Sequence, residues 1–328
     1  FYPSLITLPS RLTCSFFTFL LNLSKSKQKR RGFYASISSY FILTKDSHEN
    51  VHFYTEILGM RFVKNTVNQD NHRMLHYYYG DYQGAPGSVV TFFIIPSLGH
   101  RYENQNFIST IGLKLPQTSM AYWQERLNKY SIDYSVNDRQ IHFFDPDQVE
   151  IILTETDLPP LAMDHQVNND VPADKQIIGL HSSQLHVSDP QATSAFFETF
   201  LGWATVNQRI QLNATDFLEI LPTEANKPSH MGRGSADHIA FAVVDDTALN
   251  ELYQRAEKQG WQIEKLVSRG YFKSLYIREP GGNRIEFATL TPGFTLDEPL
   301  EKLGESLALP PFLAKQRDEI EANIYPER

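Results

Sequence analysis

The segment FYTEILG at 53–59 reappears as FFETFLG at 196–202, 143 residues further along the chain. Each copy follows a short apolar stretch and a turn that contains Asp. The aromatic residues and the leucine recur three to five residues apart, which places them on one face of a helix. The closing Gly suits the left-handed position at which many helices end. The repeat therefore predicts amphipathic helices packed on sheets in an internally duplicated chain.

A second, looser repeat alternates with the first. The helix-like stretch 119–136 matches 248–267 in pattern, and each is followed by a strand pair, at 141–155 and 274–290, whose turn carries Asp-Pro or Glu-Pro. Such turns reverse the chain and end a strand. The alternation predicts an α+β fold of four βαβββ modules, because each helix precedes several β-rich segments.

The modules give the expected domain organisation. Residues 33–156 are expected to form an N-terminal domain of two modules, and residues 177–291 a C-terminal domain of two more. Between them, residues 157–176 are polar, contain prolines and lack periodicity, which is typical of a linker. Residues 292–328 are expected to form a tail with a helical end outside the modules.

Residues 1–32 differ from the rest of the chain. An apolar patch at 16–23 is followed by a basic cluster at 25–31. A secretory signal has the opposite order, and a membrane span needs about 20 apolar residues. We expect a disordered leader that lies outside the folded core, and no membrane partner.

Composition narrows the class of function. Hydrophobic residues make up 41% of the 328 residues and charged residues 21%, which is typical of globular proteins. A net charge of -8 disfavours nucleic acid as a partner, so small molecules are expected. Cys14 is the only cysteine, which excludes an intramolecular disulfide and fits the cytoplasm. Any metal site must therefore use histidine and carboxylate ligands.

Two apolar segments near the C-terminus each carry one such ligand type. His238 lies in DHIAFAV at 237–243, and Glu286 lies in RIEFAT at 284–289. If both segments are strands, each ligand shares a face with small alanines, which leave room beside it. Alone, the pair is more often two ordinary hydrogen-bonded polar residues than a metal site.

Several long segments, in order along the chain, resemble the ring-cleaving dioxygenases of the vicinal oxygen chelate superfamily. They are residues 53–70, 76–93, 237–243, 269–289 and 292–299. The resemblance runs from about Leu43 to the C-terminus. It implies two domains of cupped mixed sheets with flanking helices, built from paired modules.

The resemblance also implies a site. Members of this family hold a divalent metal, usually Fe(II), by two histidines and one glutamate, and Mn(II) is the alternative metal. His238 and Glu286 stand at two of these positions. Tyr276 stands at an active-site tyrosine position, and Arg269 at a nearby basic position. Two imidazoles and one carboxylate on one face of iron leave adjacent positions for a diolate and dioxygen.

The sequence departs from the family in the first module, where members carry a His-His dipeptide. Here the register from FYTEILG gives Ser38 and Ser39, and a serine hydroxyl is a weak ligand for Fe(II). Three interpretations remain open. The residues before about Ile42 are not the native strand, or His181 of the third module substitutes as a ligand, or catalysis has been lost. In the second module Ile152 stands where Glu286 stands in the fourth, so one metal site is expected.

The leading hypothesis is an Fe(II)-dependent ring-cleaving dioxygenase acting on a hydroquinone or catechol, with dioxygen as co-substrate and a homo-oligomeric assembly. A non-catalytic or metal-impaired binding member of the superfamily is the first alternative, supported by Ser39. A glyoxalase-like metal isomerase is the second, although such sites generally keep two carboxylates and only Glu286 is clearly placed.

Overall fold

The computed structural model describes residues 33–324, so the expected leader of residues 1–32 lies outside the described residues. Four βαβββ modules follow one another, as the repeats predicted. The first contains β1 (Phe33–Thr44), α2 (Ser47–Val51), β2 (Arg61–Asn68), β3 (Asn71–Gly80) and β4 (Val89–Ile94). The second contains β5 (Phe107–Leu115), α3 (Met120–Lys129), β6 (Tyr134–Asn137), β7 (Gln140–Phe144) and β8 (Glu150–Glu155).

The second half of the chain repeats this order. The third module contains β9 (Gly179–Val187), α4 (Pro190–Phe196), β10 (Thr205–Val206), β11 (Arg209–Gln211) and β12 (Phe217–Pro222). The fourth contains β13 (Ala236–Val243), α5 (Asp246–Gln259), β14 (Gln262–Ser268), β15 (Lys273–Arg278) and β16 (Arg284–Thr289). Short 3₁₀ turns and α6 (Arg317–Ile324) complete the described part of the chain. This α+β architecture confirms the predicted fold class.

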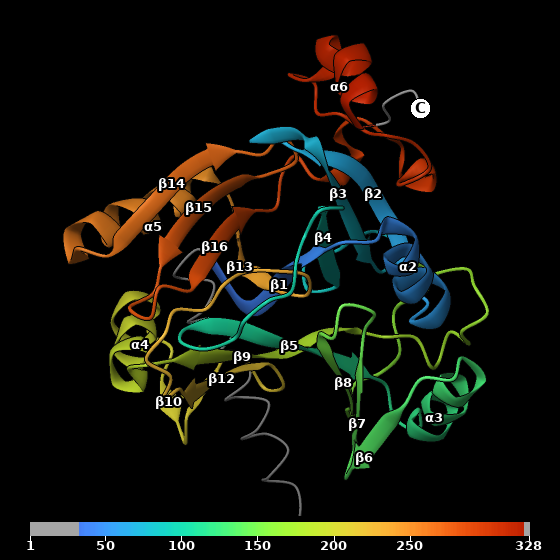
Figure 1. Cartoon of the computed structure of the whole chain (residues 1–328), viewed down its shortest axis with the longest axis horizontal. Coiled ribbons are helices and arrows are strands. Elements are labelled where there is room, and N and C mark those ends of the chain that lie inside the picture. The colour runs from blue at the N-terminus through green and yellow to red at the C-terminus, as the bar shows by residue number, and fades with distance from the viewer. Residues whose placement is uncertain (1–32, 325–328) are drawn as a thin grey trace, which may run out of the picture.

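The strands form two eight-stranded sheets that do not follow the order of the chain (Figure 1). The first sheet has the order β14-β15-β16-β13-β1-β4-β3-β2 and joins the fourth module to the first. The second has the order β10-β11-β12-β9-β5-β8-β7-β6 and joins the third module to the second. Each sheet thus takes one module from residues 33–156 and one from residues 177–291, so the two sheets do not coincide with the expected domain boundaries.

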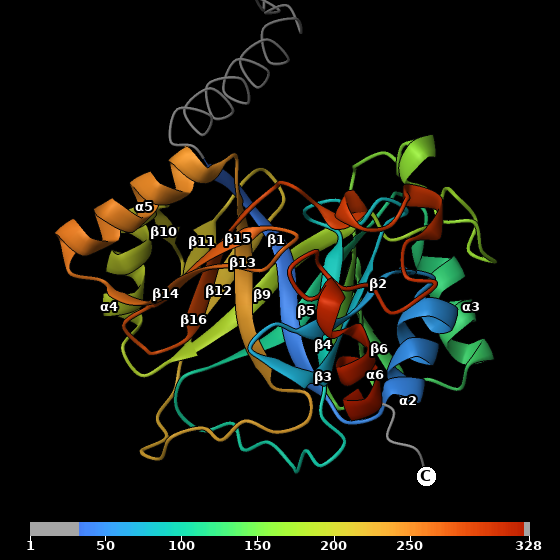
Figure 2. The ribbon, with the colours of Figure 1, turned by 90° about the horizontal axis from the view of Figure 1, so that it is seen from above.

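One apolar core joins the two sheets. It includes Ile42 of β1, Leu185 of β9 and Trp123 of α3, all fully buried. The helices α2 and α3 lie at one end of the paired sheets, and α4 and α5 at the other (Figures 1 and 2). Because side chains alternate along a strand, the residues between these core positions face the opposite side of each sheet. That opposite face of the first sheet carries His238 and Glu286.

The repeated segments form the helices that the periodicity predicted, with one difference. Both continue as π-helical turns, His52–Ile57 after α2 and Phe197–Leu201 after α4. Gly59 and Gly202 then adopt left-handed backbone angles, with φ of 71° and 73°. A side chain at Gly59 would also collide with Val171, since a Cβ there would lie 2.5 Å from its Cγ2. None of the described helices is long and apolar enough to cross a membrane.

The C-terminal tail packs beside β2 and β3, where α6 contacts the first module (Figure 2). Val67, Leu309, Leu313 and Ile320 form a small apolar cluster of their own. A buried lysine strengthens this attachment: Lys64 Nζ lies 2.6 Å from both Asp297 and Glu298 carboxylates. The tail therefore lies on the same side of the molecule as the cavity described below.

Candidate active site

His238 and Glu286 meet on two adjacent parallel strands, β13 and β16. The register pairs Ala240 with Glu286, so His238 and Glu286 are offset by two residues along the strands and lie on the same face. His238 is 2% exposed and Glu286 is fully buried. Their Nε2 and Oε2 atoms lie 2.8 Å apart. An imidazole and a carboxylate thus converge on one point, as two ligands of a single cation must.

A β-bulge brings a second carboxylate to His238. Phe41 of β1 pairs with His238 and the next residue, Ile42, pairs with Ala236, which leaves Asp237 as the extra residue. A bulge re-aims the side chain of its extra residue. The Asp237 carboxylate accepts a hydrogen bond from His238 Nδ1 at 2.6 Å and also pairs with Arg284. In a regular strand Asp237 would have faced away from His238, so the sequence pattern did not reveal its role.

Tyr276 and Arg269 lie beside the pair, on the edge nearest β14. Tyr276 is the cross-strand neighbour of Glu286, and its ring lies edge-on to that of His238 with centroids 5.4 Å apart. Arg269 donates from Nε to the Tyr276 hydroxyl oxygen at 3.3 Å. Burial raises the pKa of Tyr276 well above its usual value, and the Glu286 charge adds to this effect. Tyr276 is therefore a neutral phenol.

The charge state of the pair follows from its surroundings. Burial alone would lower the pKa of His238, but the Glu286 and Asp237 carboxylates raise it above its usual value. Burial alone would likewise raise the pKa of Glu286, whereas the adjacent imidazole lowers it. The second carboxylate oxygen, Glu286 Oε1, is buried without a well-directed hydrogen bond among the described residues. A buried oxygen in this condition suits a bound cation.

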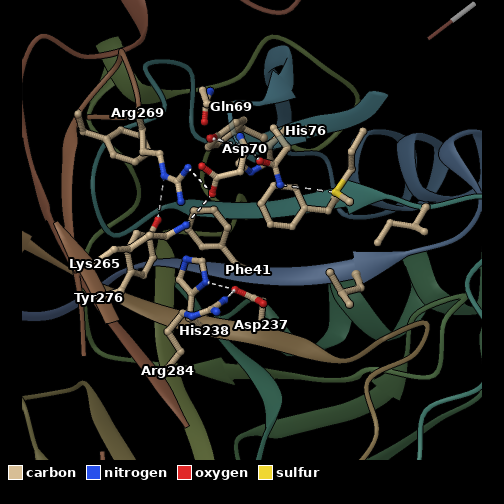
Figure 3. Close-up of a pocket in the computed structure, with 17 residues that line it drawn as sticks. Phe41, Gln69, Asp70, His76, Asp237, His238, Lys265, Arg269, Tyr276 and Arg284 are labelled. Atoms are coloured by element: carbon tan, nitrogen blue, oxygen red, sulfur yellow. Dashed lines mark hydrogen bonds and ion pairs between the residues drawn. The ribbon is translucent and has the colours of Figure 1, made fainter. Parts of the chain in front are cut away.

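A cavity of about 240 Å³ opens onto His238 (Figure 3). Aromatic and positively charged side chains make up much of its wall. They include Phe41, His76, Tyr78, Phe93, Asp237, Lys265, Arg269, Phe272, Tyr276 and Arg284. A second cavity of about 330 Å³, bordered by Ser39 and by Phe294 of the tail, shares Tyr78 and Phe272 with the first. Both cavities lie on the His238 face of the first sheet.

Among the described residues, His238 and Glu286 are the two neighbouring side chains that could hold a metal. Ser39 lies on β1 opposite Ala240, and Phe41 occupies the strand position opposite His238 and stacks on it with ring centroids 3.8 Å apart. Between residues 33 and 324, no three His, Cys, Asp or Glu side chains are arranged to hold a metal ion. An imidazole nitrogen and a carboxylate oxygen are both common ligands of divalent metals. The hydrogen bond from His238 Nδ1 to Asp237, on the ring nitrogen that does not face Glu286, is typical of a metal-bound imidazole.

The structure does not bring His181 to this pair. His181 lies on β9 of the second sheet, where its Nδ1 is 4.0 Å from Asp216 and its ring lies edge-on to Phe217. Burial lowers the pKa of His181 to about 4. His181 is therefore left out of the ligand set proposed below.

His76 is held within its own sheet. Its Nδ1 lies 3.0 Å from the Tyr78 hydroxyl and its Nε2 lies 2.5 Å from Thr91 Oγ1. Both ring nitrogens are thus engaged, as expected of a structural sheet residue that also lines the cavity.

The comparisons with known proteins agree with this architecture. Residues 179–287 match the family model described as "Glyoxalase/Bleomycin resistance protein/Dioxygenase superfamily". The chain is 32% identical over 303 residues to MhqA of Bacillus subtilis, which is provisionally named a ring-cleaving dioxygenase, covering 87% of this chain and 96% of MhqA. The chain belongs to this glyoxalase and dioxygenase superfamily, which confirms the resemblance inferred from the sequence.

Two further relatives refine the comparison. A chlorohydroquinone/hydroquinone 1,2-dioxygenase of Sphingobium indicum is 28% identical over 302 residues, covering 85% of this chain and 92% of that protein. A crystal structure of a Bacillus subtilis protein provisionally named a dioxygenase superposes with a TM-score of 0.82 at 26% identity, covering 90% of this chain and 98% of the other.

Proposed function

We propose that this protein is a ring-cleaving dioxygenase that acts on a dihydroxylated aromatic compound of the hydroquinone or catechol class, with Fe(II) as its metal. The observation that carries the proposal is the buried contact between Glu286 and His238, which lines an aromatic-walled cavity. The printed names of the relatives point to the same class of reaction. His238 and Glu286 would hold the metal.

The chain's own residues can be assigned roles in this reaction. Fe(II), when bound, would supply a Lewis-acid centre and the electrons that activate dioxygen. Asp237 accepts a hydrogen bond from Nδ1 of His238 and so leaves Nε2, which lies 2.8 Å from Glu286 Oε2, as the nitrogen that would bind a metal once its proton is released. A guanidinium can only donate hydrogen bonds, so Arg269 donates to the oxygen of the Tyr276 hydroxyl. The hydroxyl proton, which also stabilises the Glu286 charge, can then be donated to a substrate oxyanion.

The cavity walls suit a small aromatic ring. Phe41, Tyr78, Phe93 and Phe272 line the cavity together with His238. Aromatic pairs in offset or edge-on geometry stabilise a bound ring beyond the area that they bury. Arg269 adds positive charge beside the Tyr276 hydroxyl, which favours the ionised diol that ring cleavage requires.

A binding protein that lacks catalysis is the second candidate. Ser39 in place of a third ligand and the stacking of Phe41 on His238 favour it. A glyoxalase-like isomerase fits less well, because Glu286 is paired with His238 and Asp237 is occupied by His238 and Arg284, which leaves neither carboxylate free as a base.

The deciding experiment loads the full-length chain with Fe(II) under anaerobic conditions and then measures oxygen uptake with hydroquinone and with catechol. We expect uptake that matches formation of a ring-opened product and that is lost in Glu286→Gln. Tyr276→Phe should keep the metal but slow the reaction by about 10²- to 10³-fold, the typical cost of one lost oxyanion donor. Full metal occupancy without uptake would contradict the proposal and favour the binding protein. Loading with Mn(II) in parallel tests the alternative metal.

A further inference from the structure

Asp70 connects the first and fourth modules at the edge of the 240 Å³ cavity. It lies in the turn between β2 and β3, and its carboxylate accepts hydrogen bonds from Lys265 Nζ at 2.6 Å and from Arg269 Nη1 at 2.9 Å. All three residues line the cavity (Figure 3). We call this three-residue contact the Asp70 bridge.

The Asp70 bridge carries an excess of positive charge. Lys265 and Arg269 share one carboxylate, whereas the neighbouring Arg284 has two, Asp237 and Glu264. The Asp70 side chain is 51% exposed, while that of Arg269 is only 12% exposed. An exposed carboxylate is readily rehydrated, and exposed ion pairs are weak. The partner that can leave is therefore Asp70, and the charge that stays in the cavity wall is the cation of Arg269.

One guanidinium group links this contact to the catalytic side of the cavity. Arg269 donates from Nε to the Tyr276 hydroxyl and from Nη1 to Asp70. The two contacts are separated by the width of a single guanidinium. A small aromatic ring that places a hydroxyl near Tyr276 can therefore place a ring carboxylate where the Asp70 carboxylate now lies, with Lys265 as its second donor.

We propose that Lys265 and Arg269 form an anion subsite, closed by Asp70 when empty, that receives the carboxylate of a carboxylated dihydroxy-aromatic substrate. The proposal rests on the proposed function and deepens it by naming the substrate class. A neutral hydroquinone leaves the Asp70 bridge intact. A carboxylated ligand displaces the Asp70 carboxylate, and the carboxylate of the ligand then contacts Lys265 and Arg269 in its place.

The test compares two ligands that differ by one carboxylate, 2,5-dihydroxybenzoate and hydroquinone. Their binding to the full-length chain is measured by titration calorimetry under anaerobic conditions, where ring cleavage cannot occur. Asp70→Asn removes the competing charge and keeps the side-chain volume. It should tighten binding of 2,5-dihydroxybenzoate by about tenfold, equivalent to ~1.4 kcal/mol, and change hydroquinone binding by less than about twofold. Lys265→Met should weaken binding of the dihydroxybenzoate alone.

Asp246→Asn is the matched control, because Asp246 forms an exposed ion pair with Lys273 and does not line the cavity. It should change neither affinity. Equal effects of Asp70→Asn on both ligands, no effect on either, or no binding of the dihydroxybenzoate to any variant would overturn the proposal. Since the assay measures binding without turnover, its failure leaves the dioxygenase proposal untouched. A failure of oxygen uptake would leave the anion subsite as a binding site and remove only its assignment to a substrate.

Discussion

Ser39 and His238 occupy equivalent positions about a local two-fold axis between β1 and β13. Ser39 pairs with Ala240, which is two residues from His238. His238 pairs with Phe41, which is two residues from Ser39. The symmetry continues outward: Tyr78 faces Thr91 in the first module as Tyr276 faces Glu286 in the fourth. The first module therefore repeats the geometry of the site but carries serine and threonine where the fourth carries His238 and Glu286, the two proposed ligands.

Replacing Ser39 with histidine should complete the ligand set. The new imidazole would start from the position that mirrors His238, on the face that both cavities share. We expect Fe(II) affinity to rise by at least about tenfold, within the range by which residues that support metal sites change affinity. Anaerobic calorimetry with Fe(II) and Mn(II) measures it.

Ser39→Asn is the control for this substitution, because it adds a polar side chain but no imidazole. Equal affinities of the histidine and asparagine variants would mean that Ser39 does not border the metal position. Phe41, stacked on His238, is then the residue that keeps a new ligand away.

Asp237 should control metal affinity without touching the metal. In Asp237→Asn a neutral amide replaces the carboxylate that accepts the hydrogen bond from His238 Nδ1, so the proton on Nδ1 is held less strongly. Arg284 also loses one of its two carboxylate partners. Loss of such a partner typically costs about 10- to 100-fold in metal affinity. A competition assay with a coloured chelator measures the change. Asp246→Asn should leave the affinity unchanged, and an identical result for both variants would refute a positioning role for Asp237.

The sequence predicted the elements of the fold better than their pairing. The repeat at 53–59 and 196–202 and the alternating apolar strands predicted four modules, because periodicity is a local property. The same local signal cannot say which module edges meet, and β1 pairs with β13, some 200 residues away, rather than with β5. His181 was one of the alternatives for the missing ligand because it occupies the equivalent strand position in the third module, but that module pairs with the second, so its strand belongs to the other sheet.

The candidate site was predictable where regular strand geometry holds. His238, Glu286, Tyr276 and Arg269 lie together as the resemblance implied. Asp237 escaped prediction because a bulge, not alternation, turns it toward His238. Asp70 escaped because a hairpin turn 199 residues before Arg269 supplies it, and nothing in its own polar surroundings marks a long-range contact.

The tail should depend on Lys64 for its attachment. Lys64 is fully buried and pairs with Asp297 and Glu298, so Lys64→Met leaves two carboxylates without their cation. Removing one partner of a buried ion pair costs about 3–5 kcal/mol. We expect a loss of this order in the free energy of unfolding by urea. Lys302→Met, which breaks an exposed pair with Glu305, should cost less than about 1 kcal/mol, and equal losses would contradict the assignment.

A buried carboxyl at the contact between the first two modules should make stability depend on pH. Asp145, 2% exposed, accepts hydrogen bonds from the Tyr54 hydroxyl and from the backbone N–H groups of Asp147 and Val149. Burial raises the pKa of Asp145 to about 7, and the adjacent Asp147 charge also acts to raise it. In the unfolded chain the pKa of this carboxyl is about 3.9. As pH rises, the unfolded chain therefore loses the Asp145 proton at a lower pH than the folded chain does.

The sign of the effect follows from this difference. Between about pH 4 and 7 the folded state binds more protons than the unfolded state, so the free energy of unfolding falls as pH rises. Each tenfold difference in proton affinity is worth about 1.4 kcal/mol. In Asp145→Asn this fall should disappear, and the variant should be the more stable protein above pH 7. Urea unfolding at several pH values measures the slope, and an unchanged slope in the asparagine variant would show that another group controls it.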